Sequence, residues 1–332
     1  LARLALPMVH EATKPGQAGA GCELVACANY YSSLFGVLHD DLDSDADSMT
    51  LRAFLDSDAH AMTVKDRMAA LRLQREEDLD QLAKTIAAER PRWLRIRLAP
   101  IAHDDSVSID FAAALKRHGY AVQHYDTFVN RHLPTGQGGY ERYLATLPSL
   151  LRNTLARKTR QLEKSGRARV AILANSDQIA HGIEAWTRVY AASWKEAEPH
   201  PQFMPGLITM AAAQGWLRLG VVYLDEQPIA AQVWLVVSGV ASIYKLAYDQ
   251  HHARWSAGSV LTAHLMRHVF DIDRVREVDY LTGDDGYKRD WMPQWRQRRG
   301  MIAFNLRSWR GLFSAGWHLG SARAKRLLRQ WR

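Results

Sequence analysis

Three predicted strands joined by very short turns constrain the fold of this chain more than any other feature. They cover residues 216–224, 228–237 and 240–248, and only the turns D-E-Q and S-G separate them. Each strand must run antiparallel to the one before it, because a parallel connection needs a crossover of about a dozen residues. Polar residues and a glycine interrupt the apolar stretch 228–248, which favours a β-hairpin over a membrane span.

Helix and strand signals alternate on both sides of this meander, an order typical of α/β domains. A polar, glycine-rich link at 134–139 separates a first set of elements from a second set. The predicted helices are 66–90, 111–118, 140–164 with an interruption near Pro148, 177–194 capped by Ser176 or Asp177, and 259–270; the other predicted strands are 93–98, 120–129, 168–173 and 277–282.

Composition and charge narrow the class of protein. With 332 residues, 47% of them hydrophobic, the chain is long enough for two globular domains. Cys22 and Cys27 are too few for a disulfide framework or a cysteine-rich zinc site, which favours a reducing, cytoplasmic setting. The net charge of +8 is concentrated in residues 152–169 and 288–332, and the remaining residues are net acidic. This distribution argues against a surface that coats nucleic acid uniformly.

The loop before the helix at 259–270 has the composition of an anion site. It ends in Ala257, Gly258 and Ser259, so that unpaired backbone N–H groups and the positive end of the helix dipole point outward. Arg254 supplies a counter-charge nearby for a pyrophosphate. An ordinary strand-to-helix connection with a serine cap explains the same residues.

Three stretches give the chain a resemblance to GNAT acyltransferases, in particular to the CelD proteins of cellulose biosynthesis and more distantly to Fem-type aminoacyltransferases. The first is the basic helix LRNTLARKTRQLEKSG at 151–166. The second is PIAAQ at 228–232, followed by SAGSVL at 256–261. The third is Asp279 followed by GDDGYKRDW at 283–291, similar to a G-D-x-x-Y-K signature.

The resemblance implies an α/β (α+β) fold of two tandem GNAT-like domains, with mixed sheets flanked by helices. It covers about residues 139–300, and the first half matches only in its αβ order. The predicted organisation is a degenerate N-terminal domain at 1–138, a linking basic helix at 139–166, a catalytic domain at 167–304 and a basic, aromatic tail at 305–332. The basic face of the linking helix is either solvated or lines an interdomain cleft that attracts an anion.

The resemblance also implies an acyl-CoA donor, acetyl-CoA above all, without a metal. Ala257, Gly258 and Ser259 would face its pyrophosphate, although relatives often have a proline where Ala257 stands. An acceptor amine or sugar hydroxyl would attack the thioester directly, while a proton reaches the leaving thiolate.

The third stretch supplies three candidate catalytic residues for this reaction. Tyr287 would donate the proton, Lys288 would stabilise negative charge, and Asp284 would orient Lys288 or act as a base. A surface turn with a solvated ion pair is the alternative explanation of these residues.

Three further residues are candidates for contact with the acceptor. Trp194 and Phe203 flank a loop that would cover the acceptor side, and His251 follows the third meander strand. His252 adjoins His251, but no third ligand has the spacing of a metal site, so a polar loop is the prediction here.

The tail interleaves aromatic and basic residues. Trp309, Phe313 and Trp317 are spaced by four and share a helical face. Such a helix either lies on an anionic membrane surface or packs back on the domain. Peripheral association with the inner membrane would suit an acyltransferase of polysaccharide or cell-envelope synthesis. The other candidate functions are aminoacyl transfer from aminoacyl-tRNA and a non-catalytic role in a polysaccharide-synthesis complex.

Overall fold

The computed structural model divides the chain into two compact units. Unit 1 comprises residues 1–128 and 297–332, and unit 2 comprises residues 129–296. The structure describes residues 4–6, 8–12, 22–26, 28, 32, 34–36, 38–39, 58–90, 92–136, 138–174 and 176–318.

The sheet of unit 2 is built around the predicted meander. Strands β8 (Leu217–Leu224), β9 (Gln227–Val237) and β10 (Val240–Tyr248) pair antiparallel, as their short turns require. The strand order is β6-β11-β10-β9-β8-β7. The two ends of this order are β6 (Tyr120–Pro134, of which residues 129–134 belong to unit 2) and β7 (Ala168–Leu173). The short strand β11 (Glu277–Asp279) lies between β6 and β10.

Both meander turns use left-handed backbone conformations. Asp225 and Glu226 have φ values of 50° and 61°, and Ser238 and Gly239 have 46° and 72°. Two consecutive residues with positive φ are the mark of the type I′ turn, whose twist matches that of the flanking strands. The turns therefore fix the register of β8, β9 and β10.

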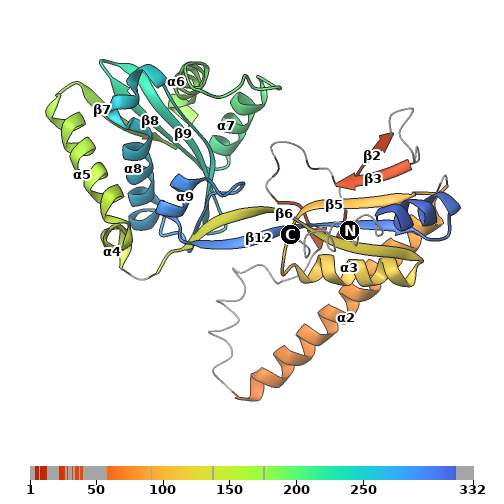
Figure 1. The fold of residues 1–332 in the computed structure, drawn as a ribbon. Helices are drawn as coiled ribbons and strands as arrows, with labels where there is room; N and C mark the ends of the chain where they lie inside the picture. Colours follow the sequence, from red (N-terminus) through yellow and green to blue (C-terminus); the bar gives the residue numbers. More distant parts are fainter. Residues whose placement is uncertain are drawn as a thin grey trace, which may run out of the picture. The chain divides into compact units, whose positions relative to one another are not determined.

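Helices cover both faces of this sheet, and each face has its own apolar core (Figure 1). One face carries α6 (Ile179–Ala191) and α7 (Phe203–Ala213), which bury Trp186 and Ile208. The opposite face carries α4 (Gly139–Thr146), α5 (Ser149–Lys164) and α8 (Ala257–Asp271). Leu155 and Leu162 of α5 are buried in this second core.

Two predicted helix starts in unit 2 are wrong, and in unit 1 the helix predicted from residue 111 begins at Ser106. The helix α8 begins at Ala257, because Ser256 precedes it in the left-handed region with a φ of 51°. Gly258 and Ser259 therefore belong to its first turn. A short 3-10 turn at Ser176–Gln178 precedes α6, and Gln178 stands at the N-cap with no capping bond from its side chain. A connection as short as the one after β7 leaves little chain for a side-chain cap.

Unit 1 has a mixed sheet with the order β2-β3-β5-β12-β6. Helices α2 and α3 share its core with β5, and Leu79, Phe111 and Ile96 are buried there. The predicted helix at 66–90 is confirmed and begins earlier. The elements are β1 (Leu4–Ala5), β2 (Met8–Ala12), β3 (Cys22–Ala26), β4 (Leu38–His39), α2 (Asp58–Ala88), β5 (Arg95–Ala102), α3 (Ser106–Arg117) and β12 (Gln294–Asn305).

The predicted fold class, mixed sheets flanked by helices, is the one observed. The unit division groups the residues differently from the four predicted ranges. The predicted linking helix, 139–166, lies within unit 2 as α4 and α5. Residues 297–304 of the predicted catalytic range belong to unit 1. Among the helices that the structure describes, none is both long and apolar enough to cross a membrane.

Replacing Glu226 by glycine should stabilise the protein. A side chain in the left-handed region costs about 1–2 kcal/mol, and glycine avoids that cost, although it loses some backbone entropy on folding. We expect the free energy of unfolding of Glu226→Gly to rise by about 0.5–1 kcal/mol in urea denaturation. Glu226→Gln is the matched control, because it removes the exposed ion pair with Arg169 but keeps the backbone penalty. An equal rise in both variants would contradict the prediction.

Candidate functional site

Strands β10 and β11 part shortly after they meet. They pair in parallel only over Val240–Ser242 and Glu277–Asp279. The strand β10 continues to Tyr248 beside β9, whereas the chain after Asp279 continues beside β6, with which β11 already pairs. There, Tyr280 N–H donates to the Arg131 carbonyl. The two strands therefore diverge at Ser242, and the predicted signature turn lies beyond the point of divergence.

A buried polar network holds the end of β11 in this position. One carboxylate oxygen of Asp279 accepts from Asn130 Nδ2 and from Leu281 N–H, both at 2.5 Å. The other accepts from Arg296 at 2.6 Å, and the same guanidinium donates to Asn130 Oδ1 at 2.6 Å. Leu281 has a φ of 58°, so the chain turns sharply within this network. Asn130 and Arg296 could not be selected from the sequence, because they are 149 and 17 residues away from Asp279 and carry no motif.

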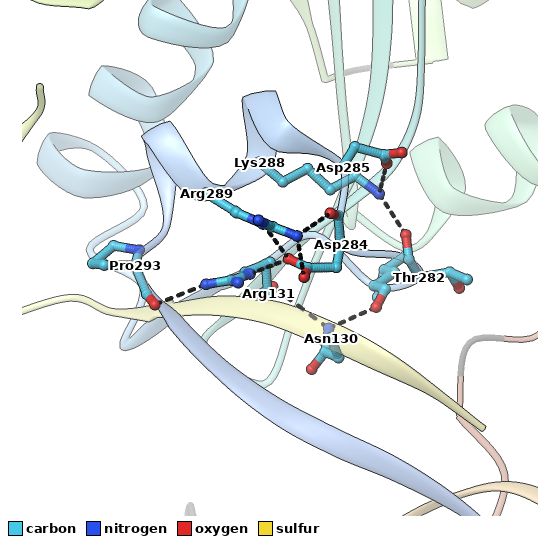
Figure 2. Close-up of polar contacts among 9 residues, drawn as sticks. Asn130, Arg131, Thr282, Asp284, Asp285, Lys288, Arg289 and Pro293 are labelled. Carbon is cyan, nitrogen blue, oxygen red and sulfur yellow. Dashed lines mark hydrogen bonds and ion pairs between the residues drawn. The ribbon is translucent and has the colours of Figure 1, made fainter. Parts of the chain in front are cut away.

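Asp284 does not orient Lys288, contrary to the prediction. Figure 2 shows it between two guanidiniums, with contacts of 2.6 Å to Arg131 and 2.7 Å to Arg289. The hydrogen bonds from Arg131 and then Arg289 lower the pKa of Asp284 to about 2. A carboxylate that holds its protons so weakly is a poor general base near neutral pH. Its contacts indicate that Asp284 fixes the turn to β6.

Asp285 is the partner of Lys288. Their ion pair measures 2.9 Å, and Lys288 Nζ also donates to the Thr282 carbonyl (Figure 2). Lys288 is 7% exposed although it stands in a turn, because α9 (Gly286–Trp291) packs its side chain inward. The sequence could not distinguish the two adjacent aspartates, since only the turn geometry decides which of them faces the lysine.

Two tyrosine rings accompany Lys288. Its ammonium lies 5.8 Å from the ring centroid of Tyr280 and 5.9 Å from that of Tyr287, and the two rings meet edge to face. Burial, and then the charge of Asp285, raise the pKa of Tyr287 to about 12. Tyr287 is therefore protonated at neutral pH and able to donate a hydrogen bond.

The first turn of α8 is clamped from β9. The buried Gln232 side chain donates to the Gly258 carbonyl at 2.9 Å and to Thr262 Oγ1 at 2.8 Å. Its own oxygen accepts from Trp234 Nε1 at 2.9 Å. The carbonyl side of this turn is thus tied down, while its amides are the ones that have no partner within a helix. This explains the place of glutamine in the predicted stretch PIAAQ.

The predicted donor residues stand together at this turn. Ala257, Gly258 and Ser259 occupy the first three helical positions. A Cβ added at Gly258 would meet only Tyr248, at an ordinary 3.5 Å, so packing within the protein does not require a glycine. Arg254 lies three residues before the helix, exposed, with its guanidinium 5.7 Å from the ring centroid of Trp255.

The three predicted acceptor residues do not form one cluster. The ring of Trp194 lies 4.6 Å from that of Tyr248, beside the end of β10. Phe203, at the start of α7, packs against the core between the sheet and helices α6 and α7. The side chain of His251 is 88% exposed and faces Asp249, whose oxygens also accept from His252. Trp194 thus contacts the strand that borders the divergence.

A cluster of lysines near the divergence was not predicted. Lys245 of β10 forms a buried ion pair with Glu198. Lys195 lies next to Trp194, with its ammonium 5.7 Å from the indole centroid. The charges of Lys245, Glu198, Lys288 and Asp285 all act on Lys195. A single lysine in a connecting segment has no sequence signature, so only the fold could bring these residues together.

The basic helix α5 borders a groove of about 710 Å³ within unit 2. Residues of α4, α5 and α8 line it, and Arg152, Arg160 and Arg267 supply positive charge there. The groove is therefore a place within unit 2 where the basic helix could attract an anion, as one of the two predicted alternatives requires. Among the described residues, no three His, Cys, Asp or Glu side chains gather as a metal site would require.

The strand–helix order around the divergence has a counterpart among known families. Residues 149–289 match the family model described as the acetyltransferase (GNAT) domain. This stretch is similar to GNAT domains. It contains the meander, the first turn of α8 and the signature turn, and the assignment to the CelD type stays a prediction. No curated protein matches the chain.

Several solved structures resemble the chain at low identity. The structure titled FemX is 9% identical, with a TM-score of 0.49, and the match covers 90% of this chain and 84% of that one. A GCN5-related N-acetyltransferase from Kribbella flavida is 14% identical, with a TM-score of 0.35, and the match covers 90% and 87%. An aminoglycoside acetyltransferase from an uncultured soil metagenomic sample is 19% identical, with a TM-score of 0.29, over 38% and 86%.

The stability that Asp284 contributes should depend on pH. Its folded pKa of about 2 lies below the ordinary value, so its ion pairs stabilise the fold above about pH 4, and this contribution disappears as the pH falls toward 2. We expect the difference in free energy of unfolding between wild type and Asp284→Asn to be constant from pH 7 to 5 and to shrink from pH 4 to 3. Asp290→Asn controls for the loss of one exposed carboxylate in the same segment. A difference that stays constant to pH 3 would contradict the prediction.

Proposed function

We propose that unit 2 transfers an acyl group from an acyl-CoA, acetyl-CoA in the simplest case, to an amine or a sugar hydroxyl. The observation that carries this proposal is the divergence of β10 and β11 between two groups of polar residues. The first turn of α8 follows β10, and the Tyr287–Lys288 turn follows β11. A donor that spans the divergence would reach both groups.

The first turn of α8 suits the pyrophosphate of the donor. Outward amides at a helix N-terminus bind anions, and the Gln232 clamp fixes their direction before the ligand arrives. Gly258 leaves space for a close approach, since its missing Cβ would touch nothing but Tyr248. Arg254 would add a mobile counter-charge at the surface.

The Tyr287–Lys288 turn suits the reacting thioester. As the acceptor attacks the carbonyl carbon, negative charge develops on the oxygen and then on the departing sulfur. Lys288 is held by Asp285 and Thr282, so it would stabilise that charge without reorganising. Tyr287, with a pKa of about 12, would give its proton to the thiolate and regain one from solvent.

Changing Ser259 to aspartate should separate donor binding from folding. A carboxylate in the first turn favours the helix dipole by about 0.3–1 kcal/mol but repels a phosphate. We expect Ser259→Asp to keep or raise the melting temperature while its affinity for acetyl-CoA, measured by isothermal titration calorimetry, falls at least about tenfold. Ser259→Asn is the neutral control of similar size. Equal affinities in wild type and Ser259→Asp would contradict this donor site.

The same titrations distinguish the other candidate functions. A donor bound as aminoacyl-tRNA would give an affinity that falls steeply with salt, because many phosphates would be neutralised. A folded protein that binds neither acetyl-CoA nor aminoacyl-tRNA would instead favour the accessory role in polysaccharide synthesis. Acetyl-CoA binding with a mild salt dependence supports the acyltransferase.

We also propose that the C-terminal segment docks on an anionic membrane surface, which would bring the enzyme to the cytoplasmic face of the inner membrane. Residues 309–318 are helical, and Trp309, Phe313 and Trp317 are 75%, 66% and 74% exposed. This exposure supports docking on a membrane over packing of the rings on the domain. Residues 288–332 contain twelve basic residues and one acid, so charge favours an anionic surface. The basic residues from Arg323 onward lie outside the described residues.

Removing the exposed rings should weaken membrane binding. We expect the triple variant Trp309→Ser, Phe313→Ser, Trp317→Ser to lose most of its co-sedimentation with vesicles of phosphatidylglycerol and phosphatidylcholine. The fold should remain, because these side chains bury little surface. Vesicles of phosphatidylcholine alone are the control for the charge requirement. Co-sedimentation equal to that of wild type would exclude this docking surface.

A further inference from the structure

Lys195 differs from the other two lysines of its cluster in having no carboxylate partner. Lys245 is paired with Glu198, and Lys288 is paired with Asp285. The ammonium of Lys195 makes no hydrogen bond or ion pair with any residue that the structure describes, and its one described contact is with the indole of Trp194. Three cations and two carboxylates thus share this region.

The surroundings of Lys195 disfavour its charged form. Burial first, and then the charges of Lys245 and Lys288, lower its pKa to about 8, although Glu198 and Asp285 oppose the shift. These groups come from the Lys195 segment itself, from β10 and from the turn at α9, and Glu196 of the same segment is exposed. At pH 7 about a tenth of Lys195 is therefore the neutral amine, far more than for an ordinary lysine.

We propose that Lys195 is the general base that accepts the proton of the attacking acceptor, an inference that rests on the acyl transfer proposed above. The group stands beside Trp194, whose ring contacts Tyr248 at the end of β10. It also lies within electrostatic reach of Lys288, across the divergence of the strands. Lys245 and Lys288 are each paired with a carboxylate, and Asp284 is paired with two arginines, so Lys195 is the member of this group without an opposite charge bound to it among the described residues.

The proton balance of the step is complete. An acceptor ammonium gives a proton to neutral Lys195, and the resulting amine attacks the thioester carbon, so that a carbon–nitrogen bond forms. The carbon–sulfur bond breaks, Tyr287 protonates the thiolate, and Tyr287 regains a proton from the nitrogen of the new amide by way of solvent. Lys195 finally releases its proton to solvent. The products are an amide, a thiol and one proton.

The titration of Lys195 tests the inference without depending on turnover. In competitive labelling with trace acetic anhydride from pH 6 to 11, mass spectrometry measures the reactivity of each lysine. We expect the half-point of Lys195 near pH 8, below the ordinary lysine value of about 10.4. Lys164, an exposed lysine at the end of α5, is the reference lysine in the same samples. Glu198→Gln should move the Lys195 half-point further down, because it removes a charge that favours the ammonium.

Two substitutions distinguish a base from a structural cation. Lys195→Arg keeps the positive charge but cannot give it up, and Lys195→Met keeps most of the volume. We expect both to lower kcat for thiol release from acetyl-CoA, with glucosamine as the amine probe, about 100-fold, and to leave the KM for acetyl-CoA within about threefold. Both should also lose the fall in rate below pH 8. Lys164→Met is the matched control.

Different results overturn different statements. A Lys195 half-point equal to that of Lys164, or a Lys195→Arg variant with the rate and pH profile of wild type, overturns the role of Lys195 while acetyl-CoA binding stands. A wild-type protein that binds no acetyl-CoA contradicts the proposed function, and the base role falls with it. A low half-point, together with equal losses in the arginine and methionine variants, supports the inference.

Discussion

The buried network around Asp279 is the constraint on which the candidate site depends. A carboxylate inside a protein must be paired and hydrogen-bonded, and Asp279 satisfies this requirement with Asn130, Arg296 and the Leu281 amide. These partners pull the chain away from β10 after three paired residues. Without them, the short strand β11 would be free to continue beside β10, and the signature turn would lie elsewhere. The strands thus diverge because the carboxylate of Asp279 is buried at the end of β11 and needs these partners.

On the β10 side of the divergence, the hydrogen bonds from Gln232 hold the first turn of α8 in place. A helix N-terminus presents amides in whatever direction its first turn takes, so an anion site needs that turn to be fixed. Gln232 fixes it through the Gly258 carbonyl, from a strand whose register the Asp225–Glu226 turn determines. The two-residue turn therefore determines the register of β9, and the register of β9 determines the direction of the α8 amides. A slip of one residue in β9 would turn Gln232 to the other face of the sheet.

Local patterns predicted the parts of the fold that local forces determine. The meander, the buried leucines of α5 and the break near Pro148 follow from turn length, helical period and the chemistry of proline. The start of α8 and the cap of α6 were missed, because a residue in the left-handed region and a short 3-10 turn depend on how the neighbouring strand ends. Asp284 and Asp285 show the same limit at the site. They are adjacent and identical, but Asp284 pairs with two arginines and Asp285 pairs with Lys288. The roles of Asn130 and Lys195 depend on contacts between distant segments, and the periodicity of a sequence does not predict such contacts.

The lysine cluster has a cost that bears on function. Burying an unpaired ammonium near two others disfavours folding, and a leucine or methionine at position 195 would avoid this cost. Direct acyl transfer, however, needs one group that accepts a proton near neutral pH and another that keeps its proton until a thiolate appears. Burial, and then repulsion from Lys245 and Lys288, lower the pKa of Lys195 toward the first property, and burial, with the charge of Asp285, raises the pKa of Tyr287 toward the second. Lys288, paired with Asp285, contributes to the shift of Lys195 and would also meet the developing charge. In the proposed reaction, the surroundings of the cluster therefore separate the pKa values of the two proton carriers, about 8 for Lys195 and about 12 for Tyr287.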